Sequence, residues 1–185
     1  IVVENIIDTV QKAYRIFETI NHKGLRLKEN DLVKNYLMEQ IDITKKLVEP
    51  PELIEADDTW YEISQRLANL GVKVDEFLRW HLVAFYGATP PPKIYDRITS
   101  IVSSKAQSQN FLDELLESSK IISKLKNPQD DEWIKMTTGR PDNELIDNLK
   151  SLDILSGGAF LPILLKGHGL PKQSVFGSSS DEFRA

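Results

Sequence analysis

The sequence predicts an all-α protein, an irregular bundle of seven to eight helices. In most segments the apolar residues recur at three- and four-residue spacing, which is the pattern of an amphipathic helix. No segment alternates apolar and polar residues as a half-buried strand does, and the connections are short and rich in glycine and proline. A repeat of roughly 34 or 40 residues is absent, so a solenoid is not indicated.

Composition places the chain among ordinary globular proteins. Of its 185 residues 41% are hydrophobic and 28% are charged, and this length allows one domain with a substantial core. The absence of cysteine excludes disulfides and thiolate metal sites, and it fits a reducing compartment. No apolar run is long enough to span a bilayer, so no membrane partner is expected. A net charge of -5 gives no general attraction for DNA, and any such contact would be local.

The first two predicted helices flank a tight turn. The apolar stripe of the first consists of Ile6, Val10, Tyr14, Phe17 and Ile20. This helix is expected to end near Asn21, and Gly24 follows where a left-handed residue is needed. The second begins near Lys28, which offers no side-chain cap, and carries Asp31 in its first turn.

Basic residues gather in this turn, and two interpretations of them stay open. They are His22, Lys23, Arg26 and Lys28, with Lys34 further on. The free backbone N–H groups and positive dipole of a helix start would make the turn a phosphate cradle. The alternative is a solvated basic turn. Asn21 and Asn35 are equally open, because an asparagine at a helix end commonly serves only as a cap.

The segment from residue 17 to residue 37 follows the pattern F-E-x-[LI]-N-x-[RK]-G-x-x-L-x-x-x-D-L-x-K-N-Y-L in register. The matching residues are Phe17, Glu18, Ile20, Asn21, Lys23, Gly24, Leu27, Asp31, Leu32, Lys34, Asn35, Tyr36 and Leu37. This segment resembles the end of the amino-terminal domain of the GmrSD-type restriction endonucleases, prokaryotic anti-phage proteins with a ParB/sulfiredoxin-like core. The helices from residue 77 onward also resemble the helical region that follows that core, although only the first motif is specific.

The resemblance implies a nucleotide-dependent DNA restriction protein of the prokaryotic cytoplasm, with a nucleoside triphosphate and Mg as cofactors. The family's Asp-Gly-Gln-Gln-Arg motif is absent from the chain, which also begins without methionine. We therefore expect a carboxy-terminal portion of a larger α+β protein, inert by itself and lacking its amino-terminal core domain. DNA would be bound through the parent protein. The residues that would complete its nucleotide- or DNA-facing edge are Asn21, Lys23, Gly24, Arg26, Asp31, Lys34 and Asn35. Two departures are Lys23, where arginine is usual, and Lys28, where serine or threonine is usual.

Pro50 and Pro51 are expected to break any helix and mark the best boundary in the chain. Beyond it, a helix is predicted from Asp57 to Leu70, closed by Gly71, with Trp60 as a core anchor. The boundary predicts closing helices of the core domain over residues 1–45, a helical bundle domain over 57–170, and a linker or tail over 171–185.

The next helix is predicted over residues 73–86 and ends at Gly87, with Asp75 and Glu76 in its first turn. It contains His81, which we interpret as a packed or surface residue, because no second histidine or carboxylate stands at metal-ligand spacing.

Four further helices are predicted over residues 94–102, 111–125, 145–155 and 160–165. In the second of these, Asp113, Glu114 and Glu117 are interpreted as a solvated face rather than as catalytic carboxylates. The helix stops at Asn127, before Pro128. The helix over 160–165 is apolar all round and is therefore expected at the centre of the core.

No catalytic residue and no metal site is predicted within the chain. The three histidines are isolated, and no P-loop, HExxH or Gly-x-Ser-x-Gly pattern occurs. A non-enzymatic helical module that binds a protein partner is the alternative function, and a homodimer is left open. Exposure of the first helix would distinguish a self-contained module from a surface left by a lost domain. A helix-turn-helix is disfavoured, because its second helix has few basic or amide side chains.

Overall fold

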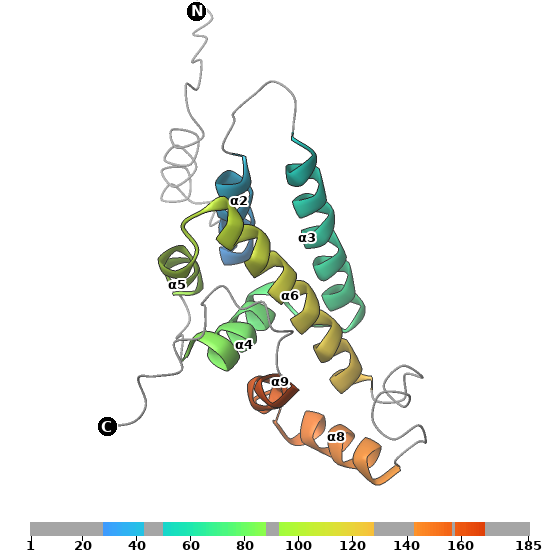
Figure 1. Ribbon diagram of the computed structural model, residues 1–185. Coiled ribbons are helices and arrows are strands. Elements are labelled where there is room, and N and C mark those ends of the chain that lie inside the picture. Colours follow the sequence, from blue (N-terminus) through green and yellow to red (C-terminus); the bar gives the residue numbers. More distant parts are fainter. Residues whose placement is uncertain (1–27, 43–49, 88–92, 128–142, 157, 169–185) are drawn as a thin grey trace, which may run out of the picture.

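The computed structural model describes residues 28–42, 50–87, 93–127, 143–156 and 158–168 (Figure 1). Within these ranges the chain forms seven helices and no strand, which confirms the all-α prediction. The helices are α2 (Glu29–Ile41), α3 (Pro51–Asn69), α4 (Val74–Tyr86), α5 (Ile94–Ile101), α6 (Lys105–Lys126), α8 (Asn143–Ser156) and α9 (Leu161–His168). The predicted first helix, the basic turn as far as residue 27 and the tail lie outside the described residues.

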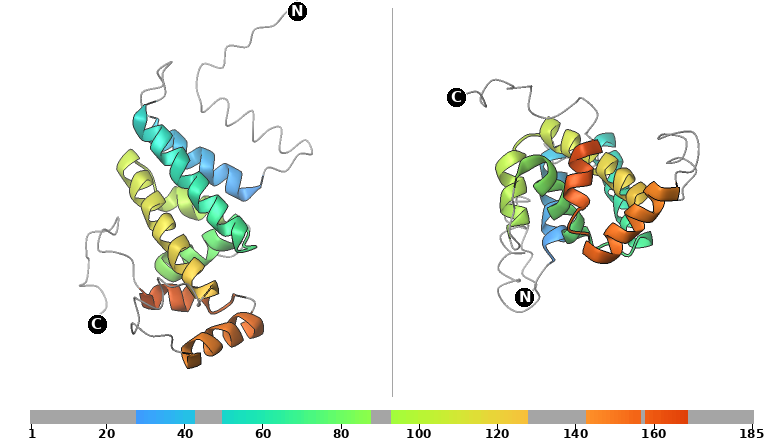
Figure 2. Two further views of the ribbon diagram at one scale, coloured as in Figure 1. Left: turned by 90° about the vertical axis from the view of Figure 1, so that its right-hand side faces the viewer. Right: turned by 90° about the horizontal axis from the view of Figure 1, so that it is seen from below.

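The longest helix, α6, is the element on which most of the bundle packs. It runs beside α3 in the same direction, with the starts of both helices joined by the Lys105–Glu52 ion pair at 3.4 Å. Helix α2 packs against α3, α5 and α6, and α4 packs most extensively against α9. Figure 2 shows α8 and α9 at the opposite end of the bundle from the start of α6.

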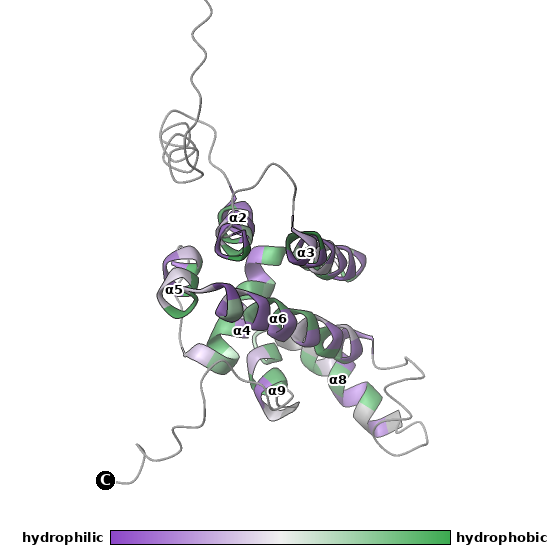
Figure 3. Cartoon of the chain, turned by 45° about the horizontal axis from the view of Figure 1, so that its top comes forward, coloured by the Kyte–Doolittle hydropathy of each residue, from purple (hydrophilic) through white to green (hydrophobic). Residues whose placement is uncertain are grey.

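The core is continuous through these helices. In Figure 3, hydrophilic residues dominate the visible faces of α3 and α6, as expected for amphipathic helices whose apolar sides turn inward. Trp60 is buried, so the prediction that it anchors the core is confirmed. The largest fully buried side chains are Phe77, Phe111, Leu37, Ile41, Ile63, Leu67, Leu78, Leu82, Ile98, Leu115, Ile122 and Leu165.

Several predicted helix ends are confirmed. Gly71 follows α3 with φ 67° and Gly87 caps α4 with φ 90°, both in the left-handed region that glycine adopts at little cost. Asn127 caps α6 at its end. At the start of α2, Lys28 occupies the N-cap position and makes no side-chain capping bond, as its residue type predicts.

Two helix starts were predicted too late. Helix α3 begins at Pro51 rather than Asp57, because proline is well suited to the first turn, where its missing N–H is not needed. Helix α6 begins at Lys105 rather than near Phe111, because Ser104 caps it by accepting a hydrogen bond from the Gln107 N–H. The first turns of α6 are polar, so the apolar pattern gave no sign of them, whereas α3 carries Leu53 and Ile54 in its first turns and was missed because its prolines were interpreted as helix breakers.

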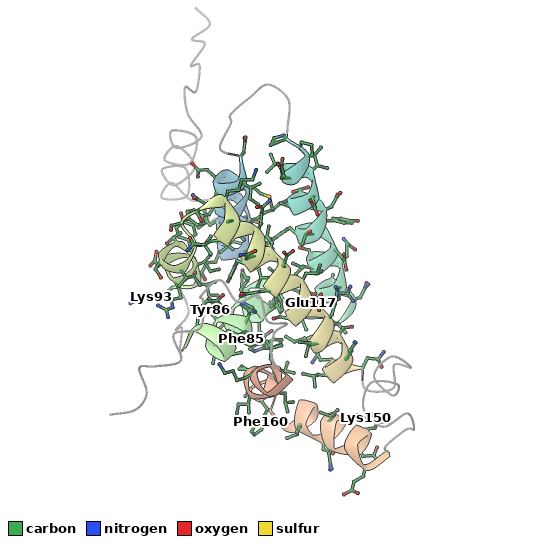
Figure 4. All side chains as sticks on the ribbon, in the orientation of Figure 1. Phe85, Tyr86, Lys93, Glu117, Lys150 and Phe160 are labelled. Atoms are coloured by element: carbon green, nitrogen blue, oxygen red, sulfur yellow. The ribbon has the colours of Figure 1, made fainter. Side chains whose placement is uncertain are left out.

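The prediction that the last helix lies at the centre of the core was wrong. Leu161 and Leu165 of α9 are buried, whereas Ile163 is 66% exposed and the preceding Phe160 is 45% exposed. Figure 4 shows Phe160 on the outer side of this end of the bundle. Because α9 lies at the end of the bundle, only one of its faces meets other helices, and apolar composition alone could not indicate this.

No helix in the described part of the chain has both the length and the apolar character needed to cross a membrane.

Candidate functional site

Of the seven residues predicted to face nucleotide or DNA, the described part of the chain contains three. Asp31, Lys34 and Asn35 belong to α2, whereas Asn21, Lys23, Gly24 and Arg26 lie outside the described residues. Asp31 and Asn35 are exposed and stand four residues apart, so they share one outward face of the helix. Lys34 forms an ion pair with Asp57 of α3, at 2.6 Å between Nζ and Oδ1.

Helix α2 holds this face in a fixed position. Val33, Leu37 and Ile41 are buried on its opposite side. The Tyr36 hydroxyl donates to the Val102 carbonyl, and the Ser108 hydroxyl donates to the Leu37 carbonyl at 2.9 Å. Apolar burial and two long-range hydrogen bonds therefore fix the orientation of Asp31 and Asn35 relative to the bundle.

Carboxylates surround the first turn of α2. The Asn30 N–H donates to the Asp75 Oδ1 of α4 at 2.9 Å, so one of the free N–H groups of the helix start is already satisfied. Glu29 and Asp31 also belong to this turn, and Glu29 accepts from the Tyr95 N–H. A phosphate close to this turn would be repelled by three carboxylates, and Lys28 is the one described cation of the predicted basic turn beside them.

A buried polar cluster joins α4 to α6, and the sequence gave no prediction of it. His81 Nδ1 lies 2.8 Å from the Ser118 Oγ, and His81 Nε2 lies 3.7 Å from the Glu114 Oε2. The Tyr86 hydroxyl donates to the same Glu114 oxygen. His81 and Ser118 are fully buried and Glu114 is 6% exposed. His81 Nε2 and Glu114 Oε1 have no hydrogen-bond partner.

Aromatic rings enclose the imidazole of His81. Its centroid lies 5.1 Å from Phe85, 5.8 Å from Tyr86 and 5.4 Å from Phe111, the last with the rings nearly perpendicular. Burial in these apolar surroundings lowers the pKa of His81, although Glu114 acts in the opposite direction. Burial also raises the pKa of Tyr86, and the neighbouring Glu114 adds to that effect. His81 is therefore neutral, and Tyr86 keeps its proton, at neutral pH.

Serine, histidine and glutamate within contact distance are the residue types of a hydrolase triad, but this arrangement cannot act as one in the folded bundle. The serine hydroxyl of a triad must reach a substrate carbonyl, and Ser118 is fully buried. The cluster instead links α4 and α6 through polar contacts, and we call this contact the α4–α6 joint.

The sequence left His81 as either a packed or a surface residue, and the structure shows it packed, whereas Glu114 was wrongly placed on a solvated face. Asp113 is exposed and Glu117 is partly exposed, in line with the prediction. Glu114 lies three residues after Phe111 and four before Ser118, on the buried face of α6. That spacing was the available signal, but a carboxylate is rarely buried, so the charge was given more weight.

Tyr86→Phe should lower the free energy of unfolding by about 1–3 kcal/mol, because it removes the hydrogen bond to a buried carboxyl oxygen. Urea unfolding at neutral pH measures this change. The matched control is Tyr61→Phe, since Tyr61 is 63% exposed, and its effect should stay within about 0.5 kcal/mol. Equal effects of the two variants would contradict a stabilising role for the Tyr86–Glu114 bond.

Two surface hollows lie between α3 and α6. One, of about 290 Å³, is lined by Glu52, Glu55 and Asp113 among others, and burial together with Glu55 and Glu117 raises the pKa of Asp113. The other, of about 440 Å³, lies near the ends of both helices, between Tyr61, Arg66 and Ser123. Among the residues that the structure places, no three His, Asp or Glu side chains are grouped closely enough to hold a metal ion.

Comparison of the chain with family models, with curated proteins and with solved structures finds no match in any of the three.

Proposed function

We propose that the chain is the helical accessory portion of a nucleotide-dependent DNA restriction protein, active in phage defence and inert without its parent. The observation that carries the proposal is the in-register motif from residue 17 to residue 37. The second half of the motif lies on α2, within the described residues, and it supports the proposal. Helix α2 is fixed in the bundle by its apolar residues and turns Asp31 and Asn35 outward. An outward polar face on a fixed helix suits contact with a preceding core domain.

The proposal assigns chemistry to the parent rather than to this bundle. A nucleoside triphosphate, Mg and DNA would be bound by the core domain. In the described residues, the only histidine with a nearby serine and carboxylate is buried, which supports an accessory role. The localisation that follows from the proposal is the prokaryotic cytoplasm.

The test begins with the product of the full gene, characterised by intact mass and amino-terminal sequencing. Nucleotide hydrolysis is then assayed with and without DNA, for that product and for the present chain. A longer protein that carries Asp-Gly-Gln-Gln-Arg and hydrolyses nucleotide, beside an inert chain, would support the proposal. A native protein that begins near Ile1 and shows no hydrolysis would overturn it.

Within an active parent, the double variant Asp31→Ala/Asn35→Ala should reduce hydrolysis or DNA cleavage while leaving the unfolding midpoint almost unchanged, because both side chains are exposed. The control Asp58→Ala/Glu62→Ala changes two exposed residues at the same spacing on α3. Equal activity of the two variants would exclude the α2 face from the site.

The alternative function is a non-enzymatic helical interaction module, and the outer side of α9 favours it. Phe160 and Ile163 are large apolar residues that remain exposed, as binding surfaces often do. The simplest partner to test is a second copy of the chain. Sedimentation equilibrium should then show self-association that Phe160→Ser/Ile163→Ser abolishes. Monomers at every concentration, for both proteins, would exclude a homodimer through this surface.

A further inference from the structure

We infer that the polar cluster of His81, Glu114, Ser118 and Tyr86 is an acid-sensitive latch, which holds α4 against α6 while His81 is neutral and releases it when the imidazole takes up a proton.

The cluster lies at the contact between α4 and α6, where separating two helices would disrupt less packing than at the α4–α9 or the α3–α6 contact. Helix α4 shares its most extensive contact with α9, and its contact with α6 is smaller, whereas α6 packs most extensively with α3. The hydrogen bonds Tyr86–Glu114 and His81–Ser118 both cross the α4–α6 joint. Loss of these polar contacts would therefore weaken the joint without touching the packing of α3 on α6.

The contacts assign one tautomer to His81. If Nε2 carried a lone pair, that lone pair would face the Glu114 oxygen at 3.7 Å, which is repulsive. The neutral ring is therefore protonated at Nε2, and the Ser118 hydroxyl donates to Nδ1 at 2.8 Å. Protonation of Nδ1 converts this acceptor into a donor, so the Ser118 hydroxyl loses its acceptor and must rotate.

Among the described ionisable groups around His81, one could balance the positive charge of an imidazolium. Helix α6 contributes Glu114, and α4 itself contributes Tyr86. From α5, Arg97 donates to the Tyr86 carbonyl, and from α9, Lys166 lies over the Phe85 ring. Neither of these cations can supply a counter-charge to an imidazolium.

The remaining neighbours of α4 bring no second counter-charge to His81. Towards α2, Asp75 bonds Asn30 more than a helical turn away from the imidazole. No described residue of α3 forms an ion pair with α4. Glu114 is thus the one described carboxylate beside the ring, and its oxygens remain incompletely hydrogen bonded.

The direction of the pH dependence follows from the two states. In the closed joint burial holds the pKa of His81 below its ordinary value of about 6.5, which the opened state recovers. The latch is therefore fully closed above about pH 6.5 and weakens as the pH falls, because the opened state binds one more proton. The opening equilibrium constant should rise as the pH falls below that value, by at most about tenfold for each pH unit.

Hydrogen exchange of the intact chain, followed by mass spectrometry at about pH 7.5 and about pH 5.5, tests the latch. After correction for intrinsic exchange, α4 amides should open more at the lower pH, by at most about tenfold, while α3 amides change little. In His81→Gln, which cannot take up the proton, the α4 response should vanish. An equal response of α3 and α4, or an unchanged response in the variant, would overturn the inference.

A measurement on the unsubstituted protein covers the case in which His81→Gln fails to fold. The imidazole Cε1–H resonance of His81 is followed by NMR as the pH is lowered. The latch requires that it does not titrate while α4 remains closed. A titration midpoint near the ordinary value of about 6.5, with the fold intact, would overturn the inference independently of any variant.

Discussion

Phe111→Ala is expected to lower the free energy of unfolding by about 3–5 kcal/mol, the range found when a fully buried phenylalanine is truncated. Phe111 is 1% exposed on α6, and its ring lies 5.4 Å from His81 and 6.0 Å from Tyr86. The substitution would leave a cavity beside a cluster that already contains two unpartnered polar atoms. Denaturant unfolding followed by circular dichroism measures the change.

The control for Phe111→Ala is Ile54→Ala on α3, because Ile54 is a large apolar residue that is 51% exposed. Its substitution should cost less than about 1 kcal/mol, since little apolar area is lost. A Phe111→Ala effect as small as that of the control would mean that α6 does not pack on α4 as described. A total stability of about 5–15 kcal/mol is usual for a domain, so a loss of about 3–5 kcal/mol would leave the Phe111→Ala variant only marginally stable.

Gly158→Ala should destabilise the protein by about 2–5 kcal/mol. Gly158 has φ 92°, a conformation that disfavours a side chain by roughly 1–2 kcal/mol. A Cβ there would also lie 2.7 Å from the Trp80 ring, and overpacking of this kind typically costs about 1–3 kcal/mol. Thermal unfolding measures the total.

Two other glycines separate these contributions. Gly71 has φ 67° but nothing within 4 Å of an added Cβ, so Gly71→Ala should show the conformational cost alone. Gly167 lies in α9 with open space around it and no positive φ, so Gly167→Ala should be neutral or stabilise by up to about 1 kcal/mol. Equal losses at residues 71 and 158 would refute the contact between Trp80 and the turn before α9.

The three- and four-residue spacing of the apolar residues was sufficient to predict the fold class. The residue types at the ends of the helices were sufficient to predict several of those ends. Gly71 and Gly87 end their helices because the left-handed conformation that follows a helix suits glycine. The starts of α3 at Pro51 and of α6 at Lys105 were missed because they are marked by a proline in the first turn and by the Ser104 cap rather than by an apolar stripe.

The polar cluster could not be predicted because it depends on how two helices meet. His81 and Glu114 are 33 residues apart, and each looked ordinary within its own helix. The alignment of α4 with α6 brings the imidazole and the carboxyl group together, and no local pattern fixes that alignment. For Asp31 and Asn35, by contrast, the spacing along α2 was enough to place both on one face.

The capping of α2 by Asp75 has a consequence for the order of folding. Lys28 provides no cap, and the carboxylate that satisfies the Asn30 N–H comes from α4, 45 residues further along the chain. A helix of 13 residues is marginal in water, since nucleation is unfavourable and the missing cap adds to the cost. A peptide of residues 28–42 should therefore be largely unstructured, and α2 should become helical late, once α4 has docked.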